Sequence, residues 1–211
     1  MMEQTISPLE QRVLGVLIEK EMATPDYYPL TLNSMTLACN QKSNRDPVVD
    51  FSEAEVMDGF DRLHRLGLAM PAASGSGRVP KFRHCLAEEL HLEIEYLALL
   101  CTLLLRGGQT TGELRNRTER MHAFEDLSSV ESALDDLVQR DPPLVKKLER
   151  QPGRKECRYI HLFGGETEGA QAEPAVDPQS RDGRLEALER EVAQLREELS
   201  ALKSQLKDLL E

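Results

Sequence analysis

The sequence predicts a mainly helical α+β protein, in which two tandem winged-helix domains precede a C-terminal coiled-coil helix. Three observations lead to this fold class. An order of three helices and a β-hairpin occurs twice, the apolar positions of the two occurrences match, and leucines near the end of the chain follow a heptad spacing. The predicted boundaries are 1–88 for the first domain, 89–163 for the second, 164–183 for a flexible linker and 184–211 for the final helix.

A capping box marks the start of the first helix. Ser7 and Glu10 have the spacing at which each side chain bonds the backbone N–H of the other residue. Pro8, between them, suits the first helical turn because it lacks an N–H that would need a partner. The loop at 24–29 contains two prolines and ends this helix.

Two more helices and a hairpin complete the first domain. The second helix is predicted over 31–40, with three apolar residues facing the core: Leu32, Met35 and Leu37. A second capping box, Ser52 with Glu55, opens a third helix that ends at Gly67. The strands of the hairpin are predicted over 68–70 and 79–86, around a turn rich in Gly and Ser.

The second domain repeats this order. Its helices are predicted over 89–105, 111–121 and 128–139, and its hairpin over 144–163, with Pro152-Gly153 at a type II turn. Val56–Leu63 matches Val130–Leu137 in its apolar positions, and Lys81–His84 matches Arg158–His161. The first helices of the two domains align at an offset of 86 residues. The repeat therefore indicates duplication of a small domain.

The C-terminal region combines a linker with a heptad repeat. The linker is rich in Gly, Pro and Glu and has no apolar periodicity. Beyond it, apolar residues alternate at spacings of three and four and form one seam: Leu185, Leu188, Val192, Leu195, Leu199, Leu202, Leu206 and Leu209. In a parallel pair, Glu191 faces Arg196 and Glu198 faces Lys203, so the charges favour a parallel homodimer. The other interpretation is a single amphipathic helix that packs on its own chain.

Composition excludes several classes of protein. No stretch approaches 18 consecutive apolar residues, and the first residues lack the basic and apolar regions of a secretory signal, so we expect a cytoplasmic protein without membrane contact. Four scattered cysteines without a C-x-x-C pair indicate reduced thiols, with Cys101 buried and Cys39 more accessible. No metal-ligand spacing, phosphate-binding glycine loop or catalytic constellation is present. We therefore expect no enzyme activity, metal or cofactor.

Basic clusters are the main functional signal. Six positive charges lie within 13 residues of the second hairpin. Others lie in the first hairpin, after the second helix of the first domain, and on or beside the second helix of the second domain. The hairpin, or wing, of a winged-helix domain commonly contacts the phosphate backbone of DNA, where Lys and Arg supply salt-dependent affinity. Together with two serines at the start of the last helix, the DNA-binding candidates are Lys42, Arg45, Arg78, Lys81, Arg83, Arg115, Arg117, Arg120, Ser128, Ser129, Lys146, Lys147, Arg154, Lys155 and Arg158.

The third helix of each domain argues against binding in the major groove. These helices carry seven acidic residues: Glu53, Glu55, Asp58, Asp61, Glu131, Asp135 and Asp136. Negative charge beside phosphates is unfavourable. Two hypotheses therefore stay open. One is a dimeric DNA-binding protein of transcription-regulator type, which contacts double-stranded DNA mainly through its second wing. The alternative is a protein-interaction scaffold built on winged-helix domains, which binds a protein partner and no DNA.

Two segments resemble a known family of bacterial proteins. Leu9–Lys20, with the sequence LEQRVLGVLIEK, and Ala38–Val48, with the sequence ACNQKSNRDPV, are similar to the corresponding segments of the YceH family. The resemblance covers about residues 5–163 and continues into the tail, and its asparagine-rich run is specific. It implies a tandem winged-helix fold and no established biochemical role.

Overall fold

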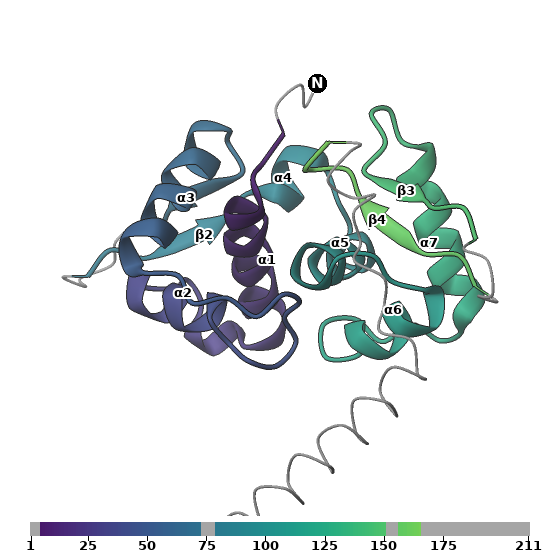
Figure 1. The fold of residues 1–211 in the computed structure, drawn as a ribbon, viewed down its shortest axis with the longest axis horizontal. Coiled ribbons are helices and arrows are strands. Elements are labelled where there is room, and N and C mark those ends of the chain that lie inside the picture. Colours follow the sequence, from purple (N-terminus) through teal and green to yellow (C-terminus); the bar gives the residue numbers. More distant parts are fainter. Residues whose placement is uncertain (1–4, 73–78, 151–155, 166–211) are drawn as a thin grey trace, which may run out of the picture. The chain divides into compact units, whose positions relative to one another are not determined.

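The computed structural model describes residues 5–72, 79–150 and 156–165 (Figure 1). The predicted turn at Pro152-Gly153, the linker from residue 166 onward and the predicted seam from Leu185 to Leu209 lie outside the described residues. The same is true of three DNA-binding candidates: Arg78, Arg154 and Lys155.

The described residues are mostly helical, with small antiparallel hairpins. In the first half the elements are α1 (Pro8–Ala23), the 3₁₀ helix η1 (Pro25–Tyr27), α2 (Leu32–Cys39), α3 (Glu53–Arg65), β1 (Ala69–Pro71) and β2 (Phe82–His84). In the second half they are α4 (Leu86–Leu90), α5 (Ile94–Arg106), α6 (Thr111–Thr118), α7 (Leu127–Gln139), β3 (Val145–Lys147) and β4 (Tyr159–His161). The predicted α+β composition is confirmed at this level.

The two hairpins are built alike. In the first, Met70 of β1 pairs with Arg83 of β2, and in the second, Lys146 of β3 pairs with Ile160 of β4. A single residue before the second long helix of each half adds a further bridge to the hairpin. Leu30 exchanges both backbone hydrogen bonds with Phe82, and Gln109 does the same with Tyr159. The equivalent bridges show that the repeat in the sequence extends to the backbone pairing.

Capping residues fix the starts of the long helices. The boxes predicted at Ser7 and Ser52 both form: each serine side chain accepts a hydrogen bond from the third helical N–H, and each glutamate carboxylate accepts one from the backbone N–H of the serine. Two further boxes open α6 at Thr110 and α7 at Asp126. The third helix of the first half ends as predicted, with Gly67 in a left-handed conformation at φ +76°.

The helix predicted from residue 89 begins later, and this boundary was wrong. The chain instead forms the short α4, then turns at His91 in a left-handed conformation (φ +49°), and α5 starts at Ile94. Leu86 and Leu92, on either side of the turn, are both buried. The break therefore lets the two leucines reach the core, which a single helix over the same residues would not allow.

Two predictions about α2 were also wrong. Met35, Ala38 and Cys39 are buried at the three- and four-residue spacing of one helix face, whereas Leu37 is 65% exposed on another face. Cys39, expected to be accessible, is fully buried, and burial raises the pKa of its thiol to about 12. Cys101 is buried as predicted.

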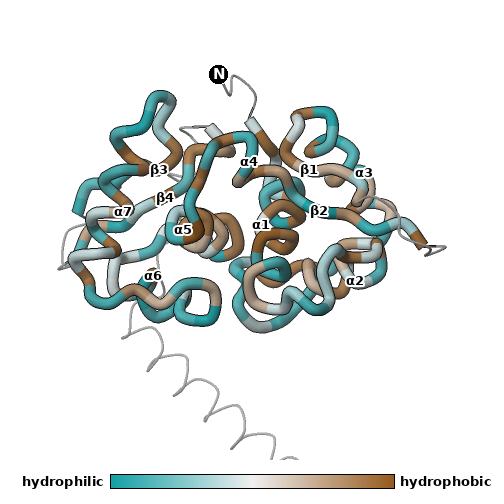
Figure 2. Tube along the Cα trace, turned by 180° about the vertical axis from the view of Figure 1, so that it is seen from behind, coloured by the Kyte–Doolittle hydropathy of each residue, from teal (hydrophilic) through white to brown (hydrophobic). Residues whose placement is uncertain are grey.

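Helices α1 and α5 pack against each other at the centre and join the two halves. Both are apolar along the segment where they lie side by side (Figure 2). Gly15 permits their close approach, since a Cβ at this position would lie 2.9 Å from side-chain atoms of Leu105. The Cys101 thiol donates to the carbonyl oxygen of Gly15 at 3.3 Å. The described residues therefore belong to one compact unit. None of the described helices is both long and apolar enough to cross a bilayer.

Candidate functional site

Arg45, one of the DNA-binding candidates, is a structural residue. Its side chain is buried, with Nη2 2.7 Å from Oε2 of Glu19 and Nη1 3.0 Å from Oε1. The guanidinium also donates to the carbonyl oxygen of Ala38. Burial alone would raise the pKa of Glu19, but the hydrogen bonds and charge of Arg45 outweigh it and hold that pKa below its usual value. Arg45 cannot reach a phosphate, because its donors are already bonded inside the protein.

A second buried arginine holds the same loop. Arg12 donates to the carbonyl oxygens of Cys39 at 3.0 Å and Pro47 at 2.6 Å. The specific sequence motif at 38–48 is therefore a loop held against α1 by two arginines. The later part of the loop contacts the second half of the protein. There the backbone N–H of Asp46 donates to the carbonyl oxygen of Leu105 at 2.9 Å. The side-chain oxygen of Asn44 accepts a bond from Arg106.

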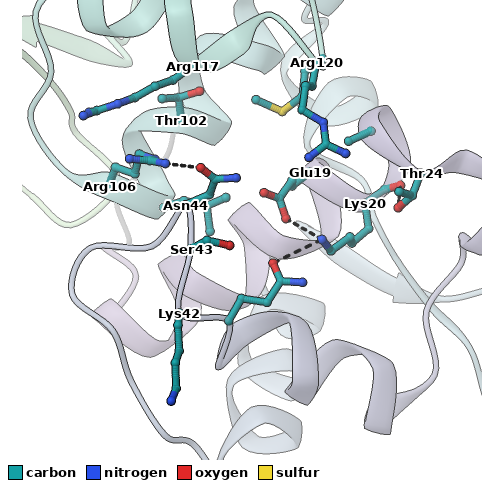
Figure 3. Close-up of a pocket in the computed structure, with 14 residues that line it drawn as sticks. Glu19, Lys20, Thr24, Lys42, Ser43, Asn44, Thr102, Arg106, Arg117 and Arg120 are labelled. Atoms are coloured by element: carbon teal, nitrogen blue, oxygen red, sulfur yellow. Dashed lines mark hydrogen bonds and ion pairs between the residues drawn. The ribbon is translucent and has the colours of Figure 1, made fainter.

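Residues 41–44 of this loop line one side of a basic cleft of about 530 Å³. The ends of α1, α5 and α6 and the loop at 41–44 line it, so both halves contribute (Figure 3). Its side chains include one carboxylate, Glu19, and five cations: Lys20, Lys42, Arg106, Arg117 and Arg120. This concentration of positive charge stands out in a chain whose formal net charge is −11.

Some cations of the cleft have an ion-pair or hydrogen-bond partner among the described residues, and others have none. Lys20 Nζ lies 3.0 Å from Glu19 and 3.5 Å from Gln41. Arg117 approaches Glu113 at 3.8 Å. Neither Lys42 nor Arg120 has a hydrogen-bond or ion-pair partner among the described residues. Figure 3 shows Arg120 extending toward α1, whereas Lys42 and Arg117 point outward from the rim.

Like charges crowd around Arg106. Burial is the first cause that lowers its pKa, and the charges of Arg117 and Arg45 are the next. Favourable interaction with the C-terminal end of a helix explains in part why basic side chains gather here, since Lys20, Arg106 and Arg117 all lie in last helical turns.

The cleft unites some of the sequence candidates and adds two residues that sequence reasoning missed. Lys42, Arg117 and Arg120 were candidates from different domains, and the fold brings them to one site. Lys20 and Arg106 were not identified. A signal for them was present, because Lys20 and Arg106 are separated by the same 86 residues that align the first helices of the two domains.

The other candidates lie on separate surfaces. Arg83 pairs with Glu88 at 2.6 Å, Arg115 donates to the carbonyl oxygen of Glu125 at 2.7 Å, and Arg158 contacts Gly108 and Glu113. Ser129 completes the capping box that Asp126 opens on α7, and Ser128 is exposed beside it. The lysines of the hairpins are exposed: Lys81, Lys146 and Lys147.

The acidic residues of the third helices face solvent, as the sequence indicated. All four on α3 are exposed, and so are the three on α7. Among the described residues no group of three His, Cys, Asp or Glu side chains is placed to hold a metal ion. His84, next to Cys85, instead contacts Glu21, with Nε2 and Oε2 2.6 Å apart.

Comparisons with known proteins identify the family. A family described as "Protein of unknown function, DUF480" matches residues 6–154. A UPF0502 protein of Geotalea uraniireducens (strain Rf4) is 54% identical over 199 residues, which cover 94% of this chain and 90% of the relative. A UPF0502 protein of Pelobacter propionicus is 50% identical over 214 residues, which cover 98% and 97%. The resemblance seen in the two sequence motifs is confirmed. The chain therefore belongs to the DUF480 family.

Proposed function

We propose that the protein is a non-enzymatic, DNA-binding protein of transcription-regulator type, made of two winged-helix domains and dimerised through its C-terminal helix. The fold supports the domain assignment, since each half has three long helices followed by a hairpin. The bridges at Leu30 and Gln109 support it further, because they give each hairpin a short third partner located between the first two long helices.

The second hairpin carries the proposal. Lys146 and Lys147 are exposed on β3, the strand that leads to the tip of this hairpin. Lys147 Nζ lies 5.4 Å from the centre of the Tyr159 ring. Contact with Tyr159 is the main cause that raises the pKa of Lys147. Exposed lysines on a wing are suited to contact phosphates without reading base sequence.

The acidic third helices determine how a duplex would dock. With Asp58 and Asp61 exposed on α3, and Glu131 and Asp135 on α7, neither helix is suited to enter a groove lined with phosphates. Docking through the second wing would keep both helices out of the grooves, although α7 packs against β3 and brings Asp135 near Lys147. We therefore expect binding that depends strongly on salt and weakly on DNA sequence.

A short labelled duplex, titrated at several salt concentrations, tests this function. Replacing both lysines, Lys146→Gln with Lys147→Gln, should weaken binding to all sequences alike. The slope of log affinity against log salt should become shallower by about one unit for each lost phosphate contact. Lys81→Gln, on the exposed part of the first hairpin, is the matched control and should change the affinity less. Wild-type protein that binds no duplex at low salt would refute the proposal.

A protein-interaction scaffold is the second candidate, and a different observation favours it. Five large apolar side chains of the first half are exposed among the described residues: Tyr27, Leu37, Val48, Met70 and Val79. Exposed apolar side chains suit a protein partner better than the phosphates of DNA. Capture of partners from lysate with and without nuclease separates the two functions. Partners that persist after nuclease treatment and are lost with Leu37→Ser would support the scaffold.

A further inference from the structure

We propose that the basic cleft between the two halves binds a small phosphorylated molecule, which consists of a phosphate or diphosphate group attached to a partly apolar organic group. This site is separate from the hairpin surface proposed for DNA: Arg120 belongs to the cleft, whereas Lys146 and Lys147 belong to the hairpin. The proposal depends on the charge of the cleft, on its size, and on the mixture of side chains that line it.

The cleft has more positive charge than its own groups neutralise. Glu19 is its only carboxylate among the described lining residues, and the buried Arg45 already matches this charge. Outside the lining, Glu113 partly matches the charge of Arg117 at 3.8 Å. Three helices end at the cleft, and each C-terminus contributes about half a negative charge. The five cationic side chains exceed this total, so a dianion such as a phosphate ester would complete the charge balance.

The size of the cleft favours a small molecule over a nucleic acid duplex. A volume of about 530 Å³ lies within the usual range of about 300 to 1,000 Å³ for small-molecule sites. The site is a hollow formed where helices end, whereas a duplex needs a wide surface that follows its backbone. A phosphate group with one organic substituent matches both the charge and the dimensions.

The lining contains the donors and the apolar surface that such a ligand needs. Arg120 extends toward α1 and has no partner among the described residues, so its planar fork of donors is available for a phosphate (Figure 3). The hydroxyl of Ser43 lies on the opposite loop. Ala23, Leu105 and Met121 supply an apolar part of the wall, against which an organic group would pack.

Binding of inorganic pyrophosphate to the full chain tests the site. Calorimetry at low ionic strength should show saturable binding of one pyrophosphate per chain, with a rise in Tm because the anion binds only the folded protein. Arg120→Gln should weaken this binding about tenfold, the effect expected for loss of a charge-assisted hydrogen bond. This variant should fold normally, because Arg120 is exposed and has no partner among the described residues.

Arg115→Gln is the matched control. Arg115 lies on α6, the helix that ends just before Arg120, and its replacement removes the same charge, but its side chain does not line the cleft. Its affinity for pyrophosphate should stay within about twofold of wild type. Absence of saturable binding, or equal weakening by the two variants, would show that the cleft is not a phosphate site.

A duplex titration separates this proposal from the DNA-binding function. Arg120→Gln should leave duplex affinity within about twofold, whereas the substitutions on β3 should reduce it. If Arg120→Gln weakens duplex and pyrophosphate binding equally, the cleft is part of a nucleic acid surface and the small-ligand proposal is wrong. If the wild type binds pyrophosphate as predicted but no duplex, the DNA function fails and the phosphate site stands.

Discussion

Single buried charges set the position of the loop after α2. Arg45 and Glu19 form a two-point contact with low exposure to solvent, and Arg12 holds the carbonyl oxygens on either side of the loop. A buried ion pair gives little net stability, yet removal of one partner is costly because the other charge stays buried alone. The pair therefore determines where the loop lies more than how stable the protein is.

Arg45→Ala should lower the free energy of unfolding by about 3 kcal/mol, because Glu19 would keep only Lys20 as a cationic partner. Unfolding in urea measures this change. Lys42→Ala, three residues earlier and exposed, is the control and should change stability by less than about 0.5 kcal/mol. Similar losses for both variants would mean that the contact between Arg45 and Glu19 does not hold the loop.

His161 makes stability depend on pH. Burial lowers its pKa from the ordinary 6.5 to about 4, so the unfolded chain takes up a proton before the folded chain as the pH falls. Its contribution to stability is therefore present above pH 6.5 and is lost progressively toward pH 4. We expect wild type to lose about 2 kcal/mol between pH 7 and pH 5 through this group.

The variant His161→Leu isolates this contribution. Its unfolding free energy should fall less than that of wild type between pH 7 and pH 5, as measured by urea titration at each pH. His122→Gln, at a partly exposed turn, should keep the wild-type dependence. Identical pH profiles for wild type and His161→Leu would contradict a buried, neutral histidine.

At the level of elements, local signals predict where helices start better than where they are interrupted. Capping residues at Ser7 and Ser52 act within one turn, so their pattern is visible in the sequence. The turn at His91 has no such signal. It allows Leu86 and Leu92 to be buried in a core that distant segments of the chain form, so its cause is not local. The outward direction of Leu37 has the same origin, since α2 is short and its core face is already filled.

Close packing of α1 on α5 predicts opposite effects for two glycines. Gly15→Ala should destabilise the protein by about 2 kcal/mol, because the new Cβ would lie 2.9 Å from Leu105 and 3.2 Å from Leu104. Gly112→Ala on α6 meets nothing within 4 Å and should stabilise by about 0.5 kcal/mol through helix propensity alone. Thermal unfolding of both variants and of the wild type measures these changes in stability. Stabilisation by Gly15→Ala would show that the two helices are not tightly packed.

For the whole molecule, the duplicated order of elements can be predicted from the sequence, but the site at which the two halves meet cannot. The repeated order of elements and the charges of Lys42, Arg117 and Arg120 were visible in the sequence. Their meeting point was not, because it depends on how the two halves pack through α1 and α5. Arg45 and Arg120 look alike in the sequence, and only the fold distinguishes a buried structural arginine from one that lines a cleft.

The C-terminal helix, outside the described residues, is proposed to set the oligomeric state. Leu195→Lys with Leu199→Lys places two charges per chain on the predicted apolar seam, and their desolvation would oppose pairing. Light scattering should show that the mass of the variant falls to that of one chain. Thermal unfolding of the two proposed winged-helix domains should stay unchanged, because the predicted linker separates them from the C-terminal helix. Gln194→Lys with Glu197→Lys adds the same number of lysines at heptad positions c and f, away from the seam, and should stay dimeric. If wild type already has the mass of one chain, the heptad seam packs on its own chain and the dimer proposal is wrong.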